Sequence, residues 1–313
     1  MLRTYYQKEM VPEECVGYSL SPKKPKLLLY LVQELGYEDH FPIFANWKPF
    51  EIEDFLIAHT ESYVKSFFKG EGPLASSNGF EWNLSLASSV CFTNASLYHA
   101  IRDSFLLDEV TFSPTSGFHH AMPNRGSAFC TFSGQVIASV KLYRELGISG
   151  AYIDLDGHFG NSIEDTKSFL PEVKQAIPFN INPKGKHAAY IKDTKQTMEL
   201  VLEEVAKNKI HYIVFCSGAD SLVDDDLGGS VSIEEWLHLK EWMYREISRF
   251  DKGSKKFPST ISLFGGYRQD HFRSVLDAHL MDLLLCLKIR YGQELPYQSE
   301  YRRKGEGSFP LGG

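Results

Sequence analysis

Cysteine is scarce in this chain of 313 residues, and the few cysteines stand apart from one another. They are Cys15, Cys91, Cys130, Cys216 and Cys286, without a Cys-x-x-Cys pair among them. An odd number of isolated cysteines disfavours a disulfide framework and a cysteine zinc site, and it fits a reducing compartment. We therefore expect a cytoplasmic protein.

Long apolar runs are absent as well. The N-terminal stretch MLRTYYQKEMVPEEC lacks the apolar core of a signal peptide, and the apolar stretch around 280–287 is short and contains Asp282. The charge excess is small, since 40 acidic residues face 33 basic ones, for a net charge of -7. A chain with this charge balance lacks the excess of basic residues that is typical of nucleic-acid-binding proteins. We therefore expect neither direct nucleic-acid binding nor membrane contact. The pattern does not indicate an oligomeric state.

What is present is a regular order of elements. The first half has a mainly helical pattern, with helices expected over 24–35, 51–69 and 84–102. From residue 133 onward, expected helices alternate with short apolar strands. The helices are 133–146, 193–208, 232–250 and about 270–289, and the strands are 150–156, 210–217 and 259–264.

This alternation predicts an α/β fold with a mostly parallel central sheet and helices on both of its faces. We expect one catalytic domain over residues 1–313, in which residues 300–313 form a surface tail.

Polar residues follow each of the three expected strands. The segments are DLDGH (154–158), GAD (218–220) and GGY (265–267). Because the carboxyl ends of parallel strands line the ligand crevice of such a sheet, the sequence predicts that these segments form one polar site.

Asp156 and His158 are two residues apart, so on an extended segment they point the same way. Together with Asp220 they would provide three metal ligands and leave a coordination position open, which is typical of catalytic rather than structural sites. Each of the three alone could equally be a helix cap or a turn residue. Their combined occurrence favours the metal site.

Two further features fit chemistry at such a metal. His119 and His120 are adjacent, as a general base and an electrostatic partner would be, although a lone histidine pair is more often a surface or packing feature. Tyr267 follows two glycines and would donate a hydrogen bond to a developing oxyanion.

Six segments in order along the chain carry a resemblance to a known family. They are SPKKPKLLLYL (21–31), HTESYVKSF (59–67), SGFHHAMPNRGSAFCTF (116–132), YIDLDGHFGNS (152–162), CSGADSLVDDDLGG (216–229) and LFGGYR (263–268). The chain resembles the histone deacetylase superfamily, which includes the acetylpolyamine amidohydrolases and has an arginase-like α/β fold. Within it we expect a bacterial-type member.

The resemblance implies a zinc ion held by Asp156, His158 and Asp220, although such an oxygen-rich ligand set also accepts Fe²⁺ or Co²⁺. It further implies that His120 acts as general base and then general acid, while Tyr267 polarises the amide carbonyl.

The remaining implied roles concern the surroundings. His119 would be the electrostatic partner, oriented by Asp154, and Asn161 would be the partner of the second histidine. Asp154 also matches a ligand of a structural potassium ion. Phe129 and Gly266 are expected in the substrate tunnel.

The implied activity is removal of an acetyl or other short acyl group by a metal-activated water, with N6-acetyl-lysine in proteins as the expected substrate. The alternatives are an acetylated polyamine or another small molecule, or a non-catalytic acyl-lysine-binding protein. A dimanganese ureohydrolase would need additional Asp-rich motifs, which we do not find. The family's Pro-Gly-Thr-Gly loop is missing after residue 176, where residues 177–190 stand instead, so the second tunnel wall is unidentified.

Overall fold

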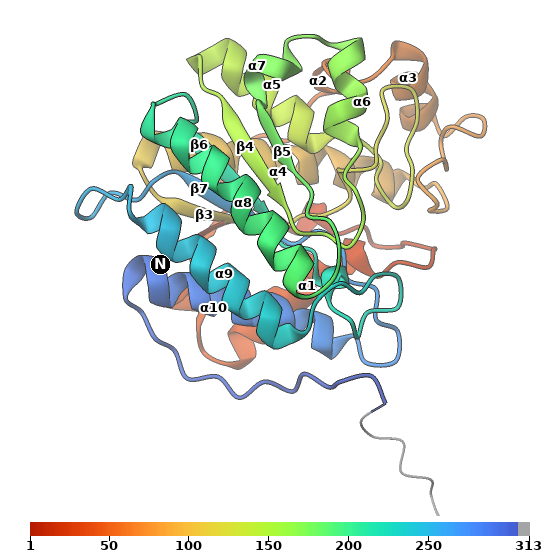
Figure 1. Ribbon diagram of the computed structural model, residues 1–313. Coiled ribbons are helices and arrows are strands. Elements are labelled where there is room, and N and C mark those ends of the chain that lie inside the picture. The colour runs from red at the N-terminus through yellow and green to blue at the C-terminus, as the bar shows by residue number, and fades with distance from the viewer. Residues whose placement is uncertain (306–313) are drawn as a thin grey trace, which may run out of the picture.

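A seven-stranded sheet runs through the centre of the molecule, as the computed structural model of residues 1–305 shows (Figure 1). The strand order is β2-β1-β3-β7-β6-β4-β5, and all pairings between these strands are parallel. The strands are β1 (Arg3–Tyr5), β2 (Ile43–Phe44), β3 (Val110–Ser113), β4 (Gly150–Asp154), β5 (Phe179–Ile181), β6 (Tyr212–Cys216) and β7 (Ser259–Ser262). The predicted α/β fold is confirmed.

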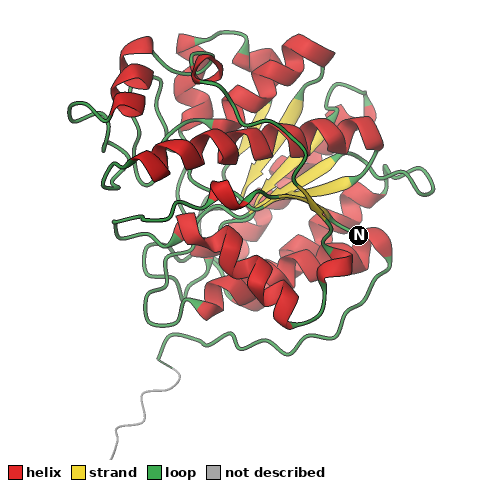
Figure 2. Ribbon diagram, turned by 180° about the vertical axis from the view of Figure 1, so that it is seen from behind, coloured by secondary structure: helices red, strands yellow, loops and turns green. Residues whose placement is uncertain are grey.

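Helices cover both faces of the sheet (Figures 1 and 2). One face packs against α1 (Lys24–Glu34), α8 (Ala188–Ala206), α9 (Ile233–Ser248) and α10 (Arg273–Tyr291). The other packs against α2 (Ile52–Phe55), α3 (Glu61–Lys69), α4 (Leu84–Leu107), α5 (Gly134–Leu146), α6 (Ser162–Phe169) and α7 (Val173–Ala176).

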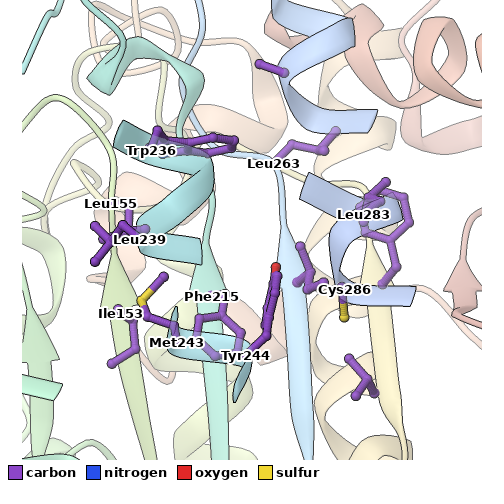
Figure 3. Close-up of a cluster of buried hydrophobic side chains, with 14 of the residues drawn as sticks. Ile153, Leu155, Phe215, Trp236, Leu239, Met243, Tyr244, Leu263, Leu283 and Cys286 are labelled. Atoms are coloured by element: carbon purple, nitrogen blue, oxygen red, sulfur yellow. The ribbon is translucent and has the colours of Figure 1, made fainter. Parts of the chain in front are cut away.

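The strand sequences explain this layering. Successive side chains of a strand point to opposite faces, so Ile153 and Phe215 enter one core while Tyr152 and Val214 enter the other. Figure 3 shows the first core, in which Trp236 and other residues of α9 lie over the strands. Because both faces are buried, β4 and β6 contain almost only apolar residues.

The first half of the chain differs from its mainly helical prediction. It contributes β1, β2 and β3, which have three, two and four residues. Strands this short carry too little alternation to be recognised in a sequence. They pair only because the rest of the sheet provides a template.

Several helix boundaries also differ from the prediction, and α4 extends to Leu107 rather than ending at residue 102. The expected helix over 51–69 is split into α2 and α3, because the Nδ1 atom of His59 lies 2.9 Å from the Met122 carbonyl and the Thr60 amide donates to the Pro123 carbonyl. Helix α8 begins at Ala188 rather than at Asp193.

Of the predicted tail at 300–313, residues 306–313 lie outside the described residues. No helix in the described part of the chain is long and apolar enough to cross a membrane.

Candidate metal and acid-base site

Four adjacent strands place the predicted site residues together. In the sheet the order β3-β7-β6-β4 is continuous, and each of these strands ends in a loop that carries site residues. Residues 119–120 follow β3, Tyr267 follows β7, Asp220 follows β6, and residues 156–158 follow β4. The three predicted strand ends therefore meet, and the histidine pair joins them from a fourth strand that the sequence did not reveal.

The three predicted metal ligands converge on one point. Nδ1 of His158 lies 3.2 Å from Oδ1 of Asp156 and 2.8 Å from Oδ2 of Asp220. One ligand atom from each residue lies within 4.8 Å of the others. The second carboxylate oxygens accept backbone N–H groups, from Gly265 to Asp156 at 2.8 Å and from Gly157 to Asp220 at 3.1 Å. Each carboxylate thus has one oxygen held by an amide of another loop and the other oxygen at the shared centre, where Oδ1 of Asp156 also accepts the His158 amide at 3.0 Å.

Glycines allow the loops to approach this closely. A Cβ atom on Gly265 would lie 2.4 Å from the Asp220 carboxylate, and one on Gly218 would lie 2.6 Å from Cα of Asp156. Side chains at these positions would push the ligand loops apart.

The charges of the cluster fit a divalent cation. Asp156 and Asp220 are buried side by side. Burial and the Asp156 charge raise the pKa of Asp220 to about 8, and hydrogen bonds to both carboxylates raise the pKa of His158 to about 11. Two carboxylates buried this close do not readily ionise together, and a bound metal ion would stabilise the ionised form of both.

The first histidine of the pair is held by carboxylates. Nδ1 of His119 lies 3.0 Å from Oδ2 of Asp154, and its Nε2 lies 3.6 Å from Oδ1 of Asp156. Burial alone would lower the pKa of His119, but the nearby Asp156 and Asp154 charges outweigh it and raise the pKa to about 9.

The second histidine has a neutral partner. Nδ1 of His120 lies 2.9 Å from Oδ1 of Asn161, whose amide nitrogen donates to Oδ2 of Asp165 at 2.6 Å. Because a carboxylate only accepts, Asp165 orients the Asn161 amide so that its oxygen faces the ring. Nδ1 of His120 then carries the proton and Nε2 is left free as a base. Burial and the neighbouring His119 charge lower the pKa of His120 to about 4.

Tyr267 lies on the other side of the metal ligands. Its ring centroid is 6.3 Å from that of His158 and 5.6 Å from that of Phe129, which in turn stacks on Tyr18. Burial raises the pKa of Tyr267 well above its ordinary value, so its hydroxyl keeps the proton. Phe129 has a left-handed φ of 65°, which bends the chain and brings its ring to Tyr267.

A cavity of about 60 Å³ adjoins these residues and is lined by His119, Phe129, Gly265 and Tyr267, among others. Gly266, which was predicted to line the tunnel, is not among the residues that line this cavity. Its φ is 132°, and a Cβ atom there would lie 2.6 Å from a Val275 methyl on α10.

The sequence reasoning missed two residues at the site. Asp165 had a weak signal, since it stands four residues after Asn161 at the start of a helix. Lys24 had none, because lysines in a polar segment are ordinarily solvated. It is fully buried, and its Nζ donates to the carbonyls of Phe264 and Gly265, the latter at 3.0 Å.

The sequence model of the histone deacetylase domain matches residues 18–176, just over half of the chain. The chain belongs to the histone deacetylase family. The matched range includes the histidine pair, Asp156 and His158, whereas Asp220 and Tyr267 lie beyond it.

Individual family members are distant from this chain. Histone deacetylase 8 of Danio rerio is 25% identical over 184 residues, which are 55% of this chain and 48% of that protein. The chloroplastic histone deacetylase 14 of Arabidopsis thaliana is 28% identical over 152 residues, which are 41% and 34% of the two chains. This chain thus spans about half or less of the length of these relatives.

A solved structure extends the likeness of the fold to nearly the whole chain. The crystal structure of the HDA15 HD domain superposes with a TM-score of 0.68 at 17% identity, covering 96% of this chain and 91% of that one. At this identity the superposition shows the shared fold.

Proposed function

We propose that this protein is a metal-dependent deacetylase that hydrolyses the amide of N6-acetyl-lysine, or of lysine carrying another short acyl group, in proteins. One observation carries the proposal. Ligand atoms of Asp156, His158 and Asp220 converge within 4.8 Å of one another, beside His120 and Tyr267, in a chain of the histone deacetylase family.

Zinc is the proposed ion, with Fe²⁺ or Co²⁺ as alternatives for the same ligand set. When bound, the ion supplies a positive charge that polarises the acyl carbonyl and lowers the pKa of water. The structural potassium ion at Asp154 stays a prediction, as does the cytoplasmic location.

His120 performs the proton transfers. Its free Nε2 accepts a proton from the attacking water as the water oxygen bonds to the acyl carbon. The imidazolium then gives this proton to the amine nitrogen as the carbon–nitrogen bond breaks, which releases a carboxylic acid and a free amine. Asn161 accepts from Nδ1 throughout, so the ring keeps its orientation.

Tyr267 supplies the hydrogen bond for the developing charge. Among residues 1–305, no hydrogen bond engages its hydroxyl, and its raised pKa keeps the proton in place. The hydroxyl donates to the carbonyl oxygen, where negative charge grows as the tetrahedral centre forms.

The carboxylates near Tyr267 favour an acyl-lysine over a polyamine. Asp225 accepts the Tyr267 amide at 2.7 Å, and Asp226 pairs with Lys304 at 2.6 Å. Both are engaged within the protein, and among the described residues no carboxylate lines the cavity beside Tyr267, so this cavity offers no anionic partner to a cationic polyamine. The half-exposed Tyr18, stacked on Phe129, instead suits the aliphatic arm of a lysine.

Two other functions fit the structure less well. A dimanganese ureohydrolase needs ligands for a second ion, and the described residues contain one group of three or more possible ligands. A purely binding protein would be expected to lack a ligand or the tyrosine, and all are present.

The test is hydrolysis of an acetyl-lysine peptide and of an N-acetylated polyamine by the purified protein, side by side, with chelator and with zinc added back. We expect turnover of the peptide that the chelator abolishes and zinc restores. Tyr267→Phe, which keeps the ring but removes the hydroxyl, should lower kcat by about a hundredfold. Absence of turnover on both substrates by a zinc-loaded protein would refute the proposal, and preference for the polyamine would refute the substrate.

A further inference from the structure

The loop that carries Tyr267 is hydrogen-bonded to a neighbouring loop that contains Asp225 and Asp226. Oδ2 of Asp225 accepts the Tyr267 amide at 2.7 Å, and Oδ2 of Asp226 accepts the Gln269 amide at 2.8 Å. The position of the tyrosine therefore depends on the loop of residues 224–226, which we call the acidic loop. This loop also follows Asp220, so it connects the metal ligand to the tyrosine.

The acidic loop is in turn held by the end of the chain. Residues 293–305, here called the strap, leave α10 as an extended segment along the surface (Figure 1). The Tyr301 hydroxyl donates to Oδ2 of Asp224 at 3.0 Å, and the Lys304 amide donates to Oδ1 of the same carboxylate at 2.7 Å. Nζ of Lys304 pairs with Oδ1 of Asp226 at 2.6 Å.

The strap also contacts the tyrosine loop directly. The side chain of Arg268, which is almost completely buried, donates to the Arg302 carbonyl, and the Arg302 amide donates to the Ser274 hydroxyl at 2.9 Å. The strap is thus bonded both to the loop that carries Tyr267 and to the acidic loop that holds it.

Electrostatics explains why the acidic loop needs this support. Three consecutive carboxylates repel one another, and only hydrogen bonds and a cation at short range offset the repulsion. The Lys304 ammonium provides the cation, and the Tyr301 hydroxyl and the backbone amides provide the hydrogen bonds.

We propose that the strap positions Tyr267 for catalysis, and that Tyr301 and Lys304 are positioning residues that act through the acidic loop. This inference rests on the proposed function. Because Tyr267 acts on charge that develops during the reaction, loss of its positioning lowers kcat and leaves KM nearly unchanged.

The test compares variants of the full chain. In Tyr301→Phe/Lys304→Met, both side-chain contacts with the acidic loop are lost, and we expect kcat to fall about tenfold with KM within about twofold. Lys304→Arg keeps the charge and should retain near-normal kcat. The matched control is Tyr297→Phe in the same strap, since the Tyr297 hydroxyl donates to Oδ1 of Asp277 on α10 at 2.7 Å, away from the acidic loop. A double variant with the kcat of this control would overturn the inference.

A second readout does not need activity. Hydrogen exchange of the Tyr267 and Gln269 amides reports their bonds to the acidic loop. We expect exchange at least about tenfold faster in the double variant, and unchanged exchange in Tyr297→Phe. If the wild-type protein hydrolyses neither substrate, the proposed function fails. Exchange that is faster in the double variant but not in the control would still show that the strap holds the loop of Tyr267 in place. Equal exchange in the double variant and the control overturns it.

Discussion

Two buried clusters of charged side chains lie near the carboxyl end of β6, and they are built differently. In one, Nζ of Lys240 lies 3.0 Å from Oδ2 of Asp282 and donates to the Ser217 hydroxyl, while the Tyr244 hydroxyl donates to Oδ1 of Asp282 at 2.7 Å. The Lys240 ammonium also lies 5.0 Å from the Trp236 ring centroid. This cluster has one positive and one negative charge, and its hydrogen bonds are closed within the protein.

The metal cluster is not balanced in this way. Asp156 and Asp220 share a single imidazole, and each directs an oxygen to the same point. The comparison teaches that charge balance separates the two roles, although the carboxylates of both clusters are buried. A balanced pair fixes the packing of α9 and α10 against the sheet, whereas two carboxylates that resist ionising together mark a place for a cation.

The largest effect is expected from Asp220→Asn, which removes a ligand charge without changing the shape of the side chain. We expect kcat/KM to fall at least about a thousandfold, or about 4 kcal/mol, while the melting temperature of the metal-free protein stays equal or rises because the repulsion from Asp156 is relieved. Steady-state kinetics and thermal unfolding measure both. In the control Asp193→Asn, a carboxylate that also accepts a backbone amide is changed away from the site. Similar activities in the two variants would contradict the ligand assignment.

The opposite behaviour is expected from Lys240→Met. It leaves the Asp282 carboxylate buried without its cation, with only the Tyr244 hydroxyl as a partner, so the free energy of unfolding should fall by about 3 kcal/mol, as urea denaturation would show. Activity per folded molecule should change little. Lys255 pairs with Asp108 at the surface, and the control Lys255→Met should lose less than about 1 kcal/mol. Equal losses would mean that the buried pair contributes no more than an exposed one.

The next largest effect is the stabilisation by zinc, which should depend on the metal cluster and not on the Lys240–Asp282 cluster. A ligand that binds only the folded state at a free concentration of about 100 times its Kd stabilises that state by about 2.7 kcal/mol. Zinc should therefore raise the melting temperature of the wild-type protein and of Lys240→Met alike, and a chelator should reverse the rise. Asp220→Asn should show a much smaller rise. If zinc stabilised Asp220→Asn as strongly as the wild type, the ion would bind elsewhere.

The smallest effect concerns the proton balance at His120. Its pKa is lowered to about 4, and the neutral Asn161 at Nδ1 does not counter this as a carboxylate would. Because the base must be neutral, kcat/KM falls as the pH drops through this pKa. Asn161→Asp should raise the pKa and move the acidic limb of the pH profile up by about one unit, or about 1.4 kcal/mol. An unchanged limb would show that another group limits activity at low pH.

In the second half of the fold the longer helices and buried strands were predictable, because they are long enough to display their periodicity. The short β5, α6 and α7 were missed there. The strands of the first half were not predictable either. Their few residues owe their conformation to pairing with neighbours, as β3 does with β7. The helix expected over 51–69 failed for a related reason, since the contacts of His59 with a distant loop override local helix preference.

For the site, the sequence alone predicted which residues carry the chemistry, and the structure brings these residues together. Asp, His and Tyr directly after buried strands are conspicuous, and the order of the motifs identified the family, whose domain model matches residues 18–176. The substrate stays a prediction, as do the ion and the individual residue roles.

Only the tertiary structure decided which groups hold these residues in place. The buried Lys24, the orienting carboxylate of Asp165 and the strap contacts of Tyr301 and Lys304 look like ordinary surface residues in the sequence. A residue type reveals the chemistry that it can perform. The hydrogen-bond partners of a side chain, its burial and the charges around it depend on segments far away in the chain, which meet only when the sheet and its helices are assembled.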